Sequence, residues 1–127
     1  KIMNITKIIL GLSLLLSSYS YAQDQPRTKE YLHSHGIAYC LSKAEPYKEE
    51  ADIAMGGYFQ MGNHSVQTAD DVEQYIDQKL KEDLGGYKHA SMPAYLMRCL
   101  EIAYSKEYRE HIADALKHSK DEKNKYL

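Results

Sequence analysis

Tryptophan is absent from this 127-residue sequence and phenylalanine occurs once, whereas tyrosine occurs 12 times. Basic residues are not in excess, because 16 Lys and Arg stand against 18 Asp and Glu, for a formal net charge of −2. A nucleic-acid-binding protein needs a basic footprint, so this balance argues against that class. The longest uncharged apolar run, residues 8–16, is too short for a comfortable membrane span of about 20 residues.

Strand patterns are also nearly missing. The sequence has no convincing alternating run of β-branched residues, no internal repeat and no low-complexity segment. Apolar residues recur instead at the spacing of amphipathic helices. We therefore expect an all-α fold, a small bundle of four to five helices, in a single domain over residues 23–127.

The first 22 residues have the order of a secretory signal peptide. Lys1 and Lys7 supply positive charge, no acidic residue precedes Asp24, and residues 8–16 form the apolar region. Residues 20–22 (Ser-Tyr-Ala) place small side chains at the two positions that a signal peptidase reads. We expect cleavage after this alanine and an exported protein without a stable membrane span. An uncleaved N-terminal anchor is the alternative.

Five segments have helical spacing. They cover residues 26–42, residues 46 to about 61, a stretch from a cap at Thr68 to the glycines at 85–86, a stretch capped by Ser91 with Pro93 in its first turn, and a last helix from about Ser105. The fourth segment has the broadest apolar surface, so we expect it to be central. The polar stretch from Ser119 is expected to fray.

Both cysteines, Cys40 and Cys99, follow the predicted leader. Two cysteines in a small exported chain most simply form one disulfide, which here would join the first helix to the fourth. Closing a loop of about 60 residues contributes on the order of 4 kcal/mol. That is a large share of the roughly 5–15 kcal/mol by which a domain is stable.

Gly56 and Gly57 lie in the middle of the second predicted helix, where each glycine costs up to about 1 kcal/mol relative to alanine. The pair therefore indicates a kink or a very close approach of another backbone.

Catalytic and metal-binding patterns are weak. Cys40 or Cys99 with His33, His89 or His111 would suit nucleophilic catalysis, but a paired cysteine offers no thiolate. His33 with His35 resembles a short metal motif, yet positions i and i+2 point apart on a helix, so we interpret these histidines as surface residues. We interpret His111 and His118 in the same way. Asp70, Asp71 and Glu73 suit helix capping better than paired catalytic carboxylates. We expect no enzyme, no metal and no cofactor.

The 12 tyrosines leave two interpretations open. Tyrosine joins an apolar body to a polar tip and is enriched at protein interfaces. Half-buried tyrosines in a thin helical core are an equally good explanation.

Four features taken together resemble the immunity proteins that protect bacteria against the fourth family of type VI secretion amidase effectors. They are the leader, residues 38–41 (Ala-Tyr-Cys-Leu), residues 54–59 (Ala-Met-Gly-Gly-Tyr-Phe), and residues 96–101 (Leu-Met-Arg-Cys-Leu-Glu) followed by residues 104–107 (Tyr-Ser-Lys-Glu). Residues 85–91 and the polar C-terminus match least well.

The resemblance implies a periplasmic, mainly helical homodimer that binds a papain-like cysteine amidase cutting the peptide stems of peptidoglycan, and blocks its substrate groove. It also implies that Cys40 and Cys99 are disulfide partners. Gly56 and Gly57 would then serve close helix packing or the dimer. The best projecting element is the glycine-bounded loop of residues 85–91, with Tyr87, Lys88, His89 and Ser91 as inhibitory residues; an ordinary exposed connector is the alternative.

Two rival functions remain open at this point. An exported helical binder of a small ligand would need a pocket of several hundred cubic ångströms lined by tyrosines and methionines. A wall-acting enzyme would need a free thiol or a metal.

Overall fold

The computed structural model describes residues 27–125, and their side chains as far as Ser119. The regular elements of the described chain are all helices, and one isolated bridge between Gly86 and Pro93 is its only β-type pairing. Its elements are an N-terminal helix (residues 27–42), the 3-10 turn η1 (Glu45–Tyr47), α2 (Lys48–Gly62), α3 (Val66–Glu82), α4 (Tyr95–Tyr104) and α5 (Lys106–Lys125). The predicted all-α fold is confirmed. The predicted leader, residues 1–22, lies outside the described residues.

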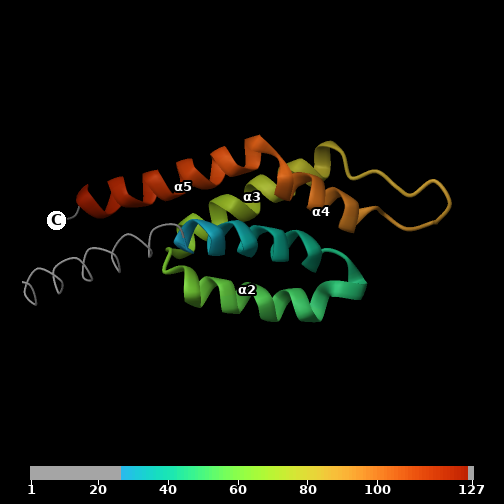
Figure 1. Ribbon diagram of the computed structural model, residues 1–127, viewed down its shortest axis with the longest axis horizontal. Helices are drawn as coiled ribbons and strands as arrows, with labels where there is room; N and C mark the ends of the chain where they lie inside the picture. The colour runs from blue at the N-terminus through green and yellow to red at the C-terminus, as the bar shows by residue number, and fades with distance from the viewer. Residues whose placement is uncertain (1–26, 126–127) are drawn as a thin grey trace, which may run out of the picture.

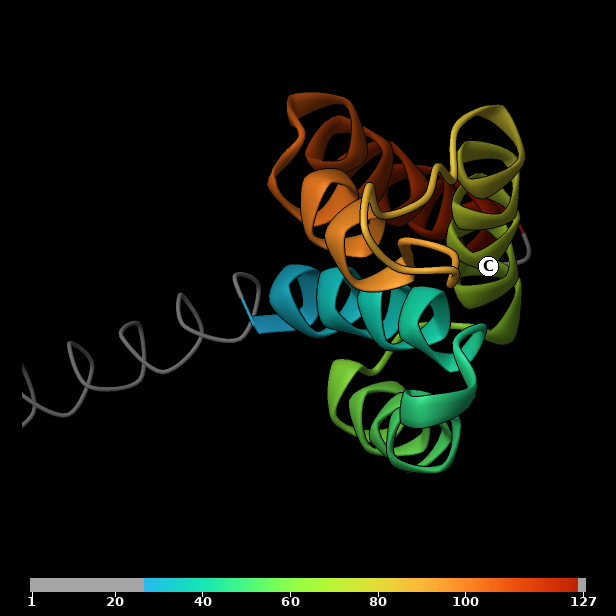
Figure 2. The same cartoon turned by 90° about the vertical axis from the view of Figure 1, so that its right-hand side faces the viewer.

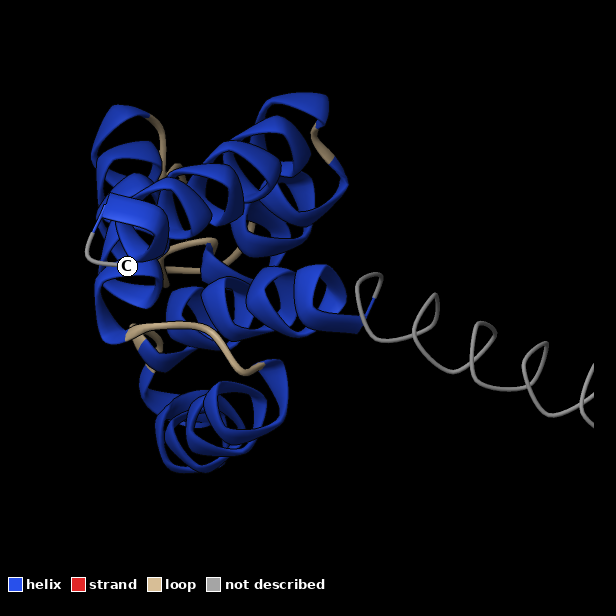
Figure 3. Cartoon of the chain, turned by 90° about the vertical axis from the view of Figure 1, so that its left-hand side faces the viewer, coloured by secondary structure: helices blue, strands red, loops and turns tan. Residues whose placement is uncertain are grey.

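The N-terminal helix occupies the middle of the bundle (Figures 1 and 2). It lies between α2 on one side and the group of α3, α4 and α5 on the other, an arrangement also visible from the opposite end (Figure 3). Within that group, α5 packs against both α3 and α4. The prediction that the fourth helix is central is therefore wrong, because α4 covers only one flank. No described helix is long and apolar enough to span a membrane.

The core is made by the N-terminal helix, α3, α4 and α5. Its buried residues are Leu32, Cys40, Val72, Ile76, Cys99, Ile102, Tyr108, Ile112 and Ala115. Helix α2 contributes none of them, and its own buried residues are Ala51 and Gly62. Its larger apolar side chains, Met55, Tyr58 and Phe59, are only partly covered. Helix α2 is thus an outer layer with thin apolar support.

The start of α3 corrects one predicted cap. Ser65, not Thr68, is the N-cap residue: its backbone is extended, and its hydroxyl oxygen accepts the Thr68 backbone N–H at 3.1 Å. The helix begins at Val66, so its first turn holds no acidic residue and Asp70 and Asp71 lie beyond it. The capping role predicted for the acidic group is wrong. Ser65 and Thr68 are both suitable N-cap residues, and because Ser65 is the one used, the helix begins three residues earlier than predicted and the acidic residues fall outside its first turn.

The fourth and fifth helices also differ from prediction at one end each. Helix α4 begins at Tyr95, since Pro93 is engaged in the bridge to Gly86, so neither Ser91 nor Pro93 belongs to the helix. Ser105 does precede α5, and its hydroxyl oxygen accepts the Tyr108 N–H at 3.2 Å, as expected of a cap. The backbone of α5 remains helical past Ser119, as far as Lys125.

Within the described residues, Gly56 and Gly57 do not serve close packing. A Cβ atom placed on either would meet nothing within 4 Å, and α2 runs through both. The interpretation of close packing inside the protomer is therefore wrong, while a contact with a second copy stays a prediction.

Candidate functional site

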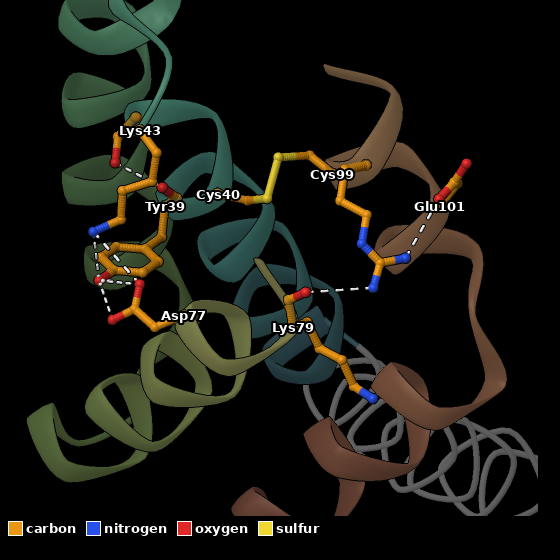
Figure 4. The surroundings of a disulfide bond; sticks show 9 residues. Tyr39, Cys40, Lys43, Asp77, Lys79, Cys99 and Glu101 are labelled. Atoms are coloured by element: carbon orange, nitrogen blue, oxygen red, sulfur yellow. Dashed lines mark hydrogen bonds and ion pairs between the residues drawn. A yellow bond between two sulfur atoms is a disulfide. The ribbon is translucent and has the colours of Figure 1, made fainter. Parts of the chain in front are cut away.

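A disulfide joins the N-terminal helix to α4, the helix that follows the loop of the candidate site. Cys40 on the N-terminal helix and Cys99 on α4 are fully buried and bonded, with an S–S distance of 2.09 Å and a Cα–Cα distance of 5.8 Å (Figure 4). The predicted pairing is confirmed. A cysteine nucleophile is excluded in this form, because both cysteines of the sequence are in the bond.

Polar contacts beside the disulfide tie the same helices to α3. The Lys43 ammonium donates a 2.8 Å hydrogen bond to the Tyr39 hydroxyl, which donates to the Asp77 carboxylate at 2.9 Å (Figure 4). Burial raises the pKa of Tyr39, and the hydrogen bond from Lys43 opposes this rise. On α4, the Arg98 guanidinium donates to the backbone carbonyl of Lys79 on α3 at 3.4 Å. The helix ends that flank the α3–α4 connection are thereby held together.

The connection between α3 and α4, residues 83–94, projects past the ends of the helices (Figure 1). Gly85 has a φ of +69°, in the left-handed region that favours glycine. The bridge between Gly86 and Pro93, with a 3.3 Å hydrogen bond from the Ala94 N–H to the Gly85 carbonyl, closes the base. We call residues 87–92 the loop tip.

The four predicted inhibitory residues share this tip but differ in exposure. Lys88, His89 and Ser91 are exposed, and so is Met92. Tyr87 is half-buried. It lines a pocket of about 320 Å³ beneath the tip, mostly apolar, whose other walls come from Lys43, Ala44, Glu45, Pro46, Tyr47, Met92, Pro93, Tyr95 and Leu96. Tyr87 therefore faces the pocket beneath the tip, while the other three side chains are exposed on its surface.

An apolar stripe runs from the loop along the outer face of α4. Leu96, Leu100 and Tyr104 follow one another at four-residue spacing, which places them on one helix face, and they are 38%, 43% and 76% exposed. Met97 beside them is also exposed. We call these four residues the α4 stripe. The sequence identified this helix as broadly apolar, but a large part of that surface faces outward.

A larger groove adjoins the α4 stripe. It has a volume of about 640 Å³ and lies between the N-terminal helix, α2 and α4. Its lining is mostly apolar, including Ile37, Leu41, Ala51, Ala54, Tyr58, Leu100 and Tyr104, with His33, Glu50 and Arg109 among its polar members. Tyr47 is shared with the pocket under the loop tip.

The histidines proposed as metal motifs make separate contacts. His33 Nε2 lies 2.9 Å from the Ala103 carbonyl, His111 stacks on Tyr75, and His118 Nδ1 lies 2.8 Å from the Asp114 carbonyl. Within the part of the chain that the structure describes, no group of three or more His, Cys, Asp or Glu residues could hold a metal ion.

One polar cluster escaped the sequence analysis. His35, interpreted as a surface residue, is only 4% exposed, and its Nε2 lies 2.9 Å from the Glu73 carboxylate of α3. Its Nδ1 lies 3.2 Å from the Met55 carbonyl of α2, and its ring is 5.7 Å from that of His64. The available signal was position, since His35 follows Leu32 by one helical turn in the buried stripe.

Comparison with known proteins identifies the family of the chain. No curated protein matches it, and no solved structure matches it. A family model described as "Tai4: Type VI secretion system (T6SS), amidase immunity protein" matches residues 28–112. The match covers more than half of the chain, and it includes both cysteines, the α3–α4 loop and the α4 stripe. The chain therefore belongs to the Tai4 family of type VI secretion system amidase immunity proteins.

Proposed function

We propose that this protein binds a cognate type VI peptidoglycan amidase and inhibits it by placing the loop tip in the active-site cleft of the enzyme. The observation that carries the proposal is a projecting, exposed tip on a base that is braced by a β-bridge and stands next to a buried disulfide. Membership of the immunity family supports an effector as the partner and a protein that does not itself catalyse a reaction.

The rigid base favours binding for a physical reason. A loop that is ordered before binding loses less conformational entropy on association than a loose one. Here the bridge of Gly86 and Pro93 orders the two arms of the loop, and Tyr87 packs beneath the tip. The tip is therefore suited to enter a cleft without first having to fold.

The chemistry of the tip suits a papain-like cysteine amidase, the effector class that the resemblance implies. Lys88, His89 and Ser91 present hydrogen-bond donors and acceptors to the polar catalytic groups of such an enzyme. The exposed Met92 adds a flexible apolar contact. An export leader over residues 1–22 would bring the protein to the periplasm, where peptidoglycan amidases act.

We further propose that two copies pair through the α4 stripe. Exposed apolar side chains gathered on one helix face indicate a protein–protein contact, because single-chain proteins rarely leave large contiguous apolar patches uncovered. The stripe provides such a gathering, and the adjoining groove extends it. Gly56 and Gly57, which no other part of the described chain approaches, are available to a second copy.

A small-ligand-binding function is the second candidate, favoured by the size of the groove. Its volume of about 640 Å³ lies within the usual range of ligand pockets. Such pockets enclose most of the ligand surface, however. This groove is bordered by Tyr104, which is 76% exposed, and none of its lining residues is a methionine. An open groove of this kind is better suited to contact with the surface of another protein than to enclosing a small molecule.

The test is inhibition of the amidase encoded beside the gene for this protein. The exported, oxidised protein is mixed with that enzyme, and release of peptide-stem fragments from peptidoglycan is measured together with co-elution of the two proteins. We expect loss of activity at a stoichiometric ratio, and no effect on an amidase of an unrelated family. Undiminished activity in the presence of excess protein would overturn the proposed function.

A further inference from the structure

The His35 ring faces hydrogen-bond acceptors at both of its nitrogens. Nδ1 lies 3.2 Å from the backbone carbonyl of Met55, and Nε2 lies 2.9 Å from the carboxylate of Glu73. A carbonyl oxygen and a carboxylate oxygen can only accept. This geometry suits the imidazolium form of His35, which alone can donate from both nitrogens and form an ion pair with Glu73.

His64 is in the opposite situation. Both of its ring nitrogens are shielded from solvent and neither makes a hydrogen bond. The ring packs edge-on against His35, at a centroid distance of 5.7 Å, and against Phe59, at 5.2 Å. Burial lowers the pKa of His64, the charge on His35 lowers it further, and the backbone of Gly62 opposes them more weakly. His64 is therefore neutral in this arrangement.

The His64 ring is wedged into the junction between α2 and α3. It belongs to the three-residue connection of residues 63–65, in which Asn63 has a φ of 51°. A Cβ atom on Gly62 would collide with the ring, lying 2.6 Å from its Cε1 atom. The ring thus packs directly against the C-terminal end of α2.

Besides this cluster, α2 is held to the N-terminal helix by partly buried contacts such as that of the Tyr58 ring, 6.4 Å from the Tyr31 ring. Its buried residues are Ala51 and Gly62, and its polar link to the N-terminal helix runs from the Met55 carbonyl to His35. The groups that face His64 are His35 from the N-terminal helix, with Glu73 of α3 behind it, and Phe59 with the Gly62 backbone from α2. One histidine cluster therefore joins three helices.

We propose that His64 is an acid-sensitive lock that holds the C-terminal half of α2 against the N-terminal helix. A proton taken up by His64 would place a positive charge against the His35 ring, and it would add a second N–H donor to a ring whose nitrogens make no hydrogen bond in the seated arrangement. Both effects favour release of α2. Since the C-terminal half of α2 supplies Tyr58 to the 640 Å³ groove, its release would also widen that groove.

The effect of pH on the seating of α2 follows from the uptake of one proton by His64. The released state takes up the proton near the ordinary histidine pKa of about 6.5, and the seated state takes it up only at lower pH. Seating of α2 is therefore fully favoured above about pH 6.5 and weakens as the pH falls below it. One proton changes the opening equilibrium by at most about tenfold per pH unit.

Hydrogen–deuterium exchange of the oxidised protein between pH 7.5 and pH 5, corrected for the intrinsic exchange rate, tests the lock. In the wild type we expect the opening equilibrium of residues 56–62 to rise several-fold below about pH 6.5, while residues 106–116 of α5 stay unchanged. His64→Phe keeps the ring contacts and cannot take up a proton, so it should abolish the pH dependence. His118→Gln, an exposed histidine of α5, is the matched control and should behave as the wild type.

A second measurement keeps the proposal falsifiable if His64→Phe does not fold. Titration of the His64 ring by NMR in the wild type should give a midpoint below about 6.5 that coincides with the change in α2. A midpoint at or above that value, or equal pH dependence of α2 in the wild type and in His64→Phe, would overturn the proposal.

Discussion

Gly36 on the N-terminal helix lies directly against the side chain of Tyr108 on α5. A Cβ atom at Gly36 would collide with the Tyr108 hydroxyl and would lie 2.6 Å from Cγ1 of Val72 on α3. The same hydroxyl donates a 2.7 Å hydrogen bond to the His33 carbonyl. The absence of a side chain at this position is what lets a fully buried tyrosine reach the backbone of the central helix.

Gly36→Ala is therefore expected to destabilise the protein strongly. Overpacking a core costs about 1–3 kcal/mol, and here the added carbon also displaces a buried hydroxyl. Gly56→Ala is the matched control, because its Cβ meets no atom and alanine favours a helix by up to about 1 kcal/mol. Urea unfolding of both variants should give opposite signs, and equal behaviour would contradict the packing described for Gly36.

Tyr108→Phe removes only the hydroxyl. Loss of its bond to the His33 carbonyl should lower the free energy of unfolding by about 1 kcal/mol at neutral pH. Burial raises the pKa of Tyr108, so its protonated form stabilises the fold below the ordinary tyrosine pKa of about 10, and this contribution is lost as the pH rises above it. Thermal unfolding at pH 7 and pH 11 should show a smaller alkaline loss in Tyr108→Phe than in the wild type.

Reduction of the disulfide should weaken the whole bundle. The bond spans 59 residues, and opening a loop of this length is expected to cost about 4 kcal/mol. Urea unfolding with and without reductant measures the difference, and Cys40→Ala/Cys99→Ala should be insensitive to reductant. Mass spectrometry of periplasmic material should find the mature chain two hydrogens lighter than its reduced form; two freely alkylated thiols there would contradict the bond.

The loop tip is expected to carry inhibition without carrying stability. In Tyr87→Ala/Lys88→Ala/His89→Ala, the two exposed positions should each change stability by less than about 0.5 kcal/mol, and only the half-buried Tyr87 should add a modest loss. Inhibition of the amidase should weaken by more than tenfold, since a few central residues carry about 2 kcal/mol or more each at an interface. Glu110→Ala/Lys117→Ala, on the exposed face of α5, is the control. Inhibition at wild-type concentrations would make the loop a connector only.

The α4 stripe is expected to hold two copies together. Leu100→Glu places a charge in the middle of an exposed apolar row, so it should leave the fold intact and disfavour pairing. Sedimentation at micromolar concentration should find a dimer for the wild type and a monomer for the variant. A wild type that sediments as a clean monomer would count against the proposed pairing.

Prediction from sequence succeeded where short-range pattern decides the outcome. The helical class, the disulfide and the start of the last helix near Ser105 each follow from the local sequence or from the small number of cysteines. It failed where two local candidates compete. Ser65 and Thr68 both suit a cap, and the choice depends on where α3 must begin to pack against α5.

The features of the candidate site also separate into those that the sequence predicts and those that depend on tertiary packing. The sequence by itself determined a glycine-bounded polar segment between two apolar helices, because such a segment has few side chains to bury. Only the tertiary structure decided that its base is bridged, that Tyr87 folds under the tip, and that half of the apolar surface of α4 faces outward. It also decided that His35 is buried beside Glu73 and His64. These features depend on which helix faces meet, and helical spacing specifies an apolar face without specifying its neighbour.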